Sequence, residues 1–199
     1  MATIEERSAE LRVLVKEFNE NIGAYKQLDG STFIQNHAFH LEVRYFAQAF
    51  VDAWTYIDEG DTDSDHLQRA IEDARRANMH GRHDITDGHI RFYCAELVDL
   101  ITRFGVNRLR EIEGMGEALE LQGKLTAFVA NSRDVRRERK DIYESIRAED
   151  IPNLKATIDV IHRTEGLLVR FDKRLLYERI FAYAFGVGGF VLAIIEFLR

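Results

Sequence analysis

Hydrophobic residues in the first half of the chain recur at steps of three and four, the spacing of a buried stripe on an α-helix. The first stripe consists of Leu11, Val15, Phe18, Ile22 and Tyr25. An Asp-Gly pair at residues 29–30 is a stop signal, so the pattern predicts a first helix that ends there. Ser31 or Thr32 can cap a second helix, which we expect to run to about Ile57.

A third helix is expected after the acidic loop at residues 58–65, with Ser64 or Asp65 as its start. Its stripe consists of Leu67, Ile71, Ala74, Asn78, Gly81, Ile85, Gly88 and Phe92. The pattern predicts that this helix continues to about Ile112 or breaks near one of its glycines.

The second half of the body shows the same periodicity. Residues 113–116 predict a turn, and the next stripe consists of Leu121, Leu125, Phe128, Ser132, Val135, Arg139, Ile142 and Ile146. Asp150-Ile151-Pro152 predicts the start of a last helix, because proline is favoured in a first helical turn. No alternating strand pattern is present, so the expected fold is all-α: a bundle of about five long helices over residues 1–172, followed by a C-terminal transmembrane helix within 173–199.

The transmembrane expectation comes from residues 180–195, IFAYAFGVGGFVLAII, which carry no charge. Counted to Leu198, the segment has 19 residues, 11 of them Ile, Leu, Val or Phe. These favour insertion by about 3 to 6 kcal/mol before the glycines and Glu196 are subtracted. The alternative is a buried helix of a soluble bundle, but the segment has no polar face and contains three glycines, which soluble helices disfavour.

Small residues within this segment share one helix face: Ala182, Gly186, Gly189 and Ala193 are 4, 3 and 4 positions apart. Such a face lets membrane helices approach closely, so it predicts self-association, and a ring of these helices can enclose a pore. Glu196 is then expected near the far interface or facing a wet lumen.

Composition adds to the expected location. The chain has 199 residues and a net charge of −7, which disfavours general binding of nucleic acid. Its single cysteine fits a reducing compartment. Residues 1–10 lack the basic and apolar regions of a signal peptide, and Lys173, Arg174 and Arg179 precede the span. The expected location is therefore a membrane, crossed once, with the N-terminal domain in the cytosol.

Arginine and histidine are dense between residues 75 and 89. Arg75 with His80, and Arg76 with His83, each fit an arginine followed by four to six residues and a histidine. This spacing resembles the motif of HEPN ribonucleases, a helical family in which arginine and histidine of two protomers cleave RNA. The resemblance covers fewer than ten residues and implies Arg75 and His80 as the catalytic pair.

The same stretch has a metal interpretation and a structural one. His80, His83, Asp84 and Asp87 lie on one helix face, and imidazole with carboxylate suits zinc, iron or manganese. The structural interpretation, which we favour, is a solvated polar face with His–Asp pairs, and no cofactor is expected.

Other charged groups have ordinary structural explanations. Asp61, Asp63, Asp65 and Glu72 are spaced like calcium ligands of an EF-hand, but His66 stands where that loop needs glycine. Helix capping explains the same acidic residues. The basic residues between 133 and 140 predict a charged outer face or contact with anionic lipids.

Together these features favour a tail-anchored, self-associating membrane protein that acts through its span, as a membrane-perturbing or pore-forming effector. Its expected partners are further copies of itself, membrane lipids and an upstream protein trigger. A membrane-tethered HEPN-like ribonuclease and a passive tail-anchored adaptor are the alternatives.

Overall fold

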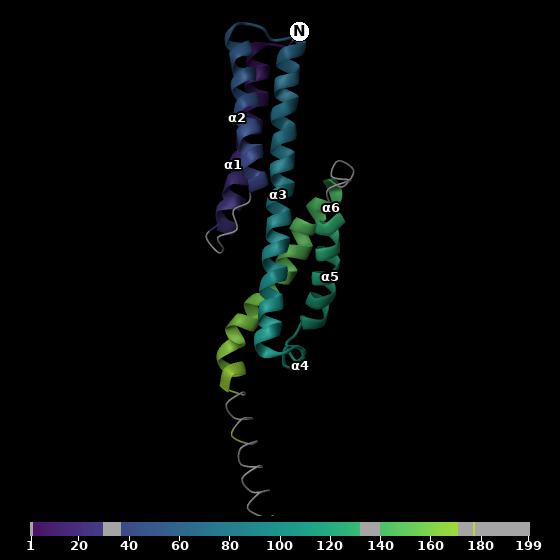
Figure 1. Ribbon diagram of the computed structural model, residues 1–199. Helices are drawn as coiled ribbons and strands as arrows, with labels where there is room; N and C mark the ends of the chain where they lie inside the picture. The colour runs from purple at the N-terminus through teal and green to yellow at the C-terminus, as the bar shows by residue number, and fades with distance from the viewer. Residues whose placement is uncertain (1, 30–36, 132–139, 171–176, 178–199) are drawn as a thin grey trace, which may run out of the picture.

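A computed structural model of the chain describes residues 2–29, 37–131, 140–170 and 177. Every regular element in these ranges is a helix, which confirms the prediction of an all-α bundle for the described part of the chain. Three helices come first: α1 (Ile4–Asp29), α2 (His37–Asp58) and α3 (Asp65–Phe104). They run down, up and down beside one another, and α3 continues through the length of the molecule (Figure 1).

The ends of α3 follow from capping chemistry. Ser64 is its N-cap, and the Ser64 hydroxyl accepts a hydrogen bond from the Leu67 amide at 3.1 Å, which confirms the predicted start. Gly105, at φ 83°, ends the helix and donates its amide to the Ile101 carbonyl at 2.8 Å. Of the two predicted outcomes, the helix therefore takes the second: it breaks at a glycine, which can adopt this positive φ, and does not continue to Ile112.

Shorter helices complete the described body: α4 (Val106–Leu109), α5 (Met115–Asn131), α6 (Lys140–Ser145), the π-helical turn η3 (Ile146–Asp150) and a helix over residues 151–170. The expected helix start at Asp150–Pro152 is wrong, because α6, η3 and residues 151–170 follow without a break. Pro152 has no amide hydrogen to donate, and the widened π turn directly before it, with the Ile151 amide bonded to the Ile146 carbonyl, lets the chain continue.

Two hydrophobic cores lie along α3. The core at the N-terminal end of the rod, which we call the distal core, joins α1, α2 and the first third of α3 (Figure 1). Its central residues are Leu11, Phe46, Ala53, Leu67 and Ile71. The proximal core joins the last third of α3 to α4, α5 and residues 146–161, with Leu97, Leu109, Leu125, Leu154 and Ile158 at its centre. The described chain is therefore an elongated rod of two stacked bundles that share α3 (Figure 1).

The helix over residues 151–170 descends to the end of the rod opposite the N-terminus (Figure 1). None of the described helices is both long and apolar enough to cross a bilayer. The predicted span at residues 180–198 lies outside the described residues, and so do its small-residue face and Glu196.

Candidate functional site

The middle of α3, residues 78–89, is the most polar buried region of the described chain, and we call it the polar waist. His83, Asp84, Thr86 and Asp87 are each at most 6% exposed. The expectation that this stretch forms a solvated polar face is therefore wrong. Burial of such groups is costly unless hydrogen bonds compensate, so their contacts define the site.

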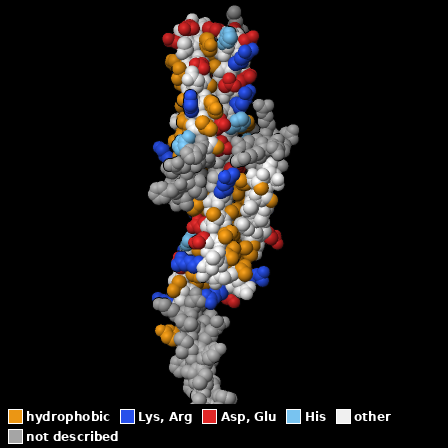
Figure 2. Space-filling view, in the orientation of Figure 1, with side chains coloured by type: hydrophobic (Ala, Val, Ile, Leu, Met, Phe, Trp, Pro, Cys, Tyr) orange, Lys and Arg blue, Asp and Glu red, His pale blue; other side chains and the backbone are white. Residues whose placement is uncertain are grey.

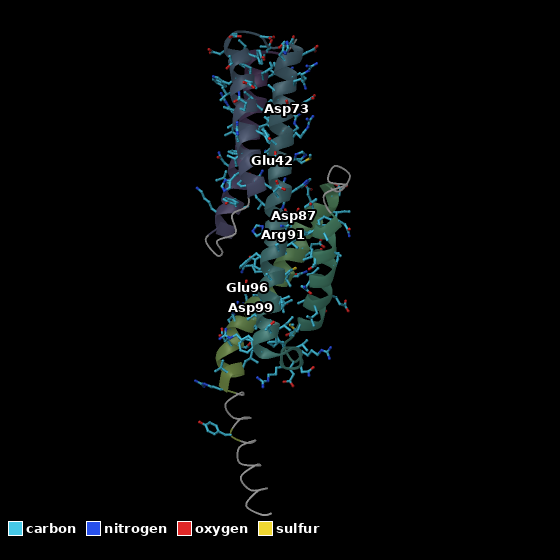
Figure 3. All side chains as sticks on the ribbon, in the orientation of Figure 1. Glu42, Asp73, Asp87, Arg91, Glu96 and Asp99 are labelled. Atoms are coloured by element: carbon cyan, nitrogen blue, oxygen red, sulfur yellow. The ribbon has the colours of Figure 1, made fainter. Side chains whose placement is uncertain are left out.

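Overlap of the two bundles encloses the polar waist. The lower ends of α1 and α2 cover it from one side, and α6 and the adjoining end of α5 cover it from the other (Figure 1). Asp87 marks this level of α3, below Glu42 of α2 and above Arg91, Glu96 and Asp99 (Figure 3). A periodic stripe predicts burial on one face only, whereas two overlapping bundles bury this part of α3 all round.

On the side of α1 and α2, the contacts of the polar waist join amides and an aromatic ring. Asn21 donates through Nδ2 to Oδ1 and to the backbone carbonyl of Asn78, at 2.6 and 3.0 Å. Asn78 donates in turn to Glu17 Oε2 at 3.1 Å. Gly81 faces the buried Phe39 ring so closely that a Cβ there would lie 3.3 Å from it. The amide pair fixes α1 against α3, and Gly81 allows close approach of α2.

On the side of α6, one tyrosine makes the main contacts. The Tyr143 hydroxyl donates to Asp87 Oδ1 at 3.0 Å, and both side chains are buried. The Tyr143 ring stacks on His83 with centroids 4.1 Å apart, and the ring of Phe128 meets it edge-on at 5.0 Å. Tyr143 therefore anchors α6 to the polar waist by a charge-assisted hydrogen bond and ring stacking.

A groove of about 560 Å³ opens beside the polar waist, between α1, α3 and the α6–η3 segment. Its α1 wall is acidic, with Glu17 and Glu20. The opposite wall holds Arg82 from α3 and Arg147 from η3, with Glu144 between them. This volume lies in the range of small-molecule sites, which often occur between packed units.

The electrostatics of the arginine wall are unbalanced. Arg82 Nη1 lies 3.9 Å from Glu144 Oε1, a long ion pair whose side chains are both about half exposed. Burial lowers the pKa of Arg147, the nearby Arg82 lowers it further, and Glu144 partly opposes these effects. Two guanidinium groups thus share one carboxylate, which leaves an excess positive charge at this wall.

Arg75 and His80, the residues that the HEPN resemblance implies, lie on different sides of α3. Arg75 pairs with Glu10 at 2.7 Å in the groove just described. His80 Nδ1 lies 3.6 Å from Glu42 Oε1 and faces a second groove between α2 and α3. The other arginine–histidine pair that matches the spacing, Arg76 with His83, is divided in the same way: Arg76 lies in the second groove and His83 in the first. Neither pair converges within the protomer.

The metal interpretation of His80, His83, Asp84 and Asp87 gains no support from geometry. His83, Asp84 and Asp87 are enclosed in the polar waist, and Tyr143 already donates to Asp87. Among the described residues, no group of three or more histidine, cysteine or carboxylate side chains is arranged to hold a metal ion.

The acidic loop before α3 makes capping and turn contacts. Asp61 Oδ1 accepts from the Ser64 amide at 3.1 Å, and hydrogen bonds with Ser64 are the main cause that lowers the pKa of Asp61. Asp63 accepts from the Ala2 amide at 3.1 Å. These contacts agree with the capping interpretation of the loop.

Sequence reasoning did not single out Asn21, Tyr143, Glu144 or Arg147. The available signal was Asn78, a polar residue on an otherwise apolar stripe. A buried amide requires a partner, and that partner, Asn21, is 57 residues away in sequence.

Comparison with known proteins adds no relative. No protein-family model, no curated protein and no solved structure matches the chain. The function must therefore be argued from the residues and their arrangement.

Proposed function

We propose that the chain is a single-pass, self-associating membrane protein. Its helical rod stands in the cytosol, and it acts through a span formed by residues 180–198. Association of several spans perturbs the membrane or forms a pore. The observation that carries the proposal is the uncharged run from Ile180 to Ile195, long enough with its flank to approach the thickness of a bilayer core.

The shape of the described rod supports this arrangement. Residues 151–170, which lead toward the apolar run, end at the pole of the rod farthest from the N-terminus (Figure 1). An anchor that follows this helix would hold the rod by one end and leave the other end free in the cytosol.

The charges at the two ends support the same orientation. The end that contains the α2–α3 loop is acidic, with five carboxylates between Asp58 and Asp65 and two more in the first turn of α1. The opposite end mixes acidic groups with arginines of α3, α4 and residues 151–170, as the blue side chains in Figure 2 show. An anionic cytosolic leaflet repels the acidic end of the rod more than the end of mixed charge, so the mixed end is the one expected to face the membrane.

Membrane fractionation of the full chain tests the anchor. We expect the full chain to stay in the pellet after a carbonate wash, and a truncation that ends at Arg174 to be released. If both chains are released, the apolar run belongs to a soluble fold and the proposal is wrong.

Particle size in a mild detergent tests self-association through the small-residue face. Replacing Gly186 and Gly189 by leucine should dissociate the oligomer, because two large side chains would block close helix approach. Gly188→Leu is the matched control, since residue 188 lies off that face. Dye release from liposomes then separates a pore, which requires the intact face, from an anchor, which releases no dye in any variant.

A further inference from the structure

We propose that the groove beside the polar waist binds a small organic phosphate, with the phosphate between Arg82 and Arg147 and hydrogen-bond donors of the ligand toward Glu17 and Glu20. The groove lies between α1, α3 and η3 and has a volume of about 560 Å³. The site itself does not rest on the membrane anchor, because every residue in it belongs to the described rod. Only the choice of a soluble ligand over a lipid headgroup rests on the proposed orientation of the rod.

The first argument is charge. Arg82 and Arg147 come from two different elements and converge on one wall, where Glu144 is the carboxylate that both approach. The Arg82–Glu144 contact is long, at 3.9 Å, and Arg147 forms no ion pair with any described residue. Guanidinium groups bind phosphate oxygens with charge-assisted hydrogen bonds, and two of them can hold oxygens from two directions.

The second argument is the local backbone. Arg147 belongs to the π-helical turn η3, and Tyr143, one turn earlier, is fixed to Asp87 and His83. Single π turns inside helices are often found at functional sites. The tyrosine anchor gives Arg147 a defined position beside the groove.

The third argument is the rest of the lining. Glu17 and Glu20 on α1 offer acceptors across the groove, and Glu17 is held by Asn78. Val13 of α1 adds an apolar residue to the lining of the groove, although it is 57% exposed. An acceptor wall, an apolar surface and a cationic wall together fit an organic phosphate with an amino or hydroxyl group at its other end.

The position of the groove selects a soluble ligand over a lipid headgroup. Arg82 precedes the end of α3 at Phe104 by 22 residues, or about 33 Å of helix. Headgroups at the proximal end of the rod would not reach that far.

Isothermal titration calorimetry of the full chain in a non-ionic detergent tests the inference, with AMP, inorganic phosphate and adenosine as probes. AMP supplies both halves of the expected ligand, so it should bind more tightly than phosphate or adenosine alone. Arg82→Gln and Arg147→Gln should each weaken AMP binding roughly tenfold or more. Glu20→Gln should weaken AMP binding and leave phosphate binding unchanged or stronger.

Arg91→Gln is the matched control, because Arg91 is an exposed arginine of the same helix outside the groove. Circular dichroism of each variant establishes that the helices are intact. Absence of AMP binding to the folded wild type would overturn the inference. Equal AMP affinity in Arg82→Gln, Arg147→Gln and Arg91→Gln would overturn it as well.

Discussion

The two ends of α3 and its polar waist belong to one continuous helix but are buried in different ways. At residues 65–77 and 90–104, a one-sided stripe of leucine, isoleucine and alanine packs into the distal and proximal cores. At residues 78–89, nearly every face of the helix is buried, and five of the eight buried residues are polar: Asn78, His83, Asp84, Thr86 and Asp87. The difference arises because each end contacts one bundle, whereas the polar waist contacts both.

This difference separates two kinds of stabilisation. Apolar burial at the ends scales with the area removed from water and is tolerant of small displacements. Hydrogen bonds at the polar waist require particular partners, and a missing partner leaves a buried polar group without compensation. The ends should therefore determine how stable the rod is, and the polar waist how the two bundles are placed relative to each other.

The largest effects are expected from cavities in the two cores. Leu97→Ala in the proximal core and Ile71→Ala in the distal core each remove a side chain that is fully buried, at a cost of about 2 to 5 kcal/mol. Chemical denaturation followed by circular dichroism measures the loss. A single transition that shifts in both variants indicates that α3 couples the bundles into one cooperative unit.

Val98→Ala is the control for Leu97→Ala, because Val98 is an exposed residue of the same helical turn. It should change stability by about 0.5 kcal/mol or less. If each core variant instead shifts a separate transition, the bundles unfold independently and the polar waist does not couple them.

The helices and the cores were predictable because both follow local rules. The cap at Ser64 and the apolar stripes of α1 and α3 are short-range features of the sequence. The continuous helix through Pro152 was not predictable in the same way, since proline at a first turn and proline after a π turn look alike in sequence. The enclosure of the polar waist depends on how two bundles overlap, which no local pattern records.

The second prediction concerns the tyrosine anchor of the polar waist. Tyr143→Phe keeps the ring stacked on His83 but removes the hydroxyl that donates to Asp87 at 3.0 Å. Loss of that donor should destabilise the rod by about 1 to 3 kcal/mol. Thermal unfolding of the full chain in detergent measures it.

Tyr45→Phe serves as the comparison, because Tyr45 is 58% exposed on α2 and its hydroxyl can bond to water. A Tyr143→Phe variant as stable as Tyr45→Phe would show that the hydrogen bond at the polar waist contributes little.

The third prediction compares two helical glycines. Gly123 of α5 has open space where a Cβ would lie, so Gly123→Ala should stabilise the rod by about 0.5 to 1 kcal/mol through helix propensity. Gly81→Ala places its Cβ 3.3 Å from the Phe39 ring, which is itself buried. Crowding should cancel or exceed the same gain. If thermal unfolding shows that both variants are stabilised equally, the contact between α2 and the polar waist accommodates the added methyl group without a measurable cost.

The smallest expected effect is a dependence of the rod's stability on pH, which arises from His89 in the polar waist. Burial lowers the pKa of His89 below its ordinary value of 6.5, and a hydrogen bond with the Ile85 backbone opposes this only in part. Below about pH 6.5, the unfolded chain therefore takes up a proton that the folded chain resists, so stability falls as the pH decreases through this range until the lowered pKa is passed. Melting temperatures measured between about pH 7.5 and 5.5 should decline in the wild type and decline less in His89→Gln. Identical slopes in the two chains would show that His89 is protonated as readily in the folded rod as in the unfolded chain, and that the polar waist is more open to water than its burial implies.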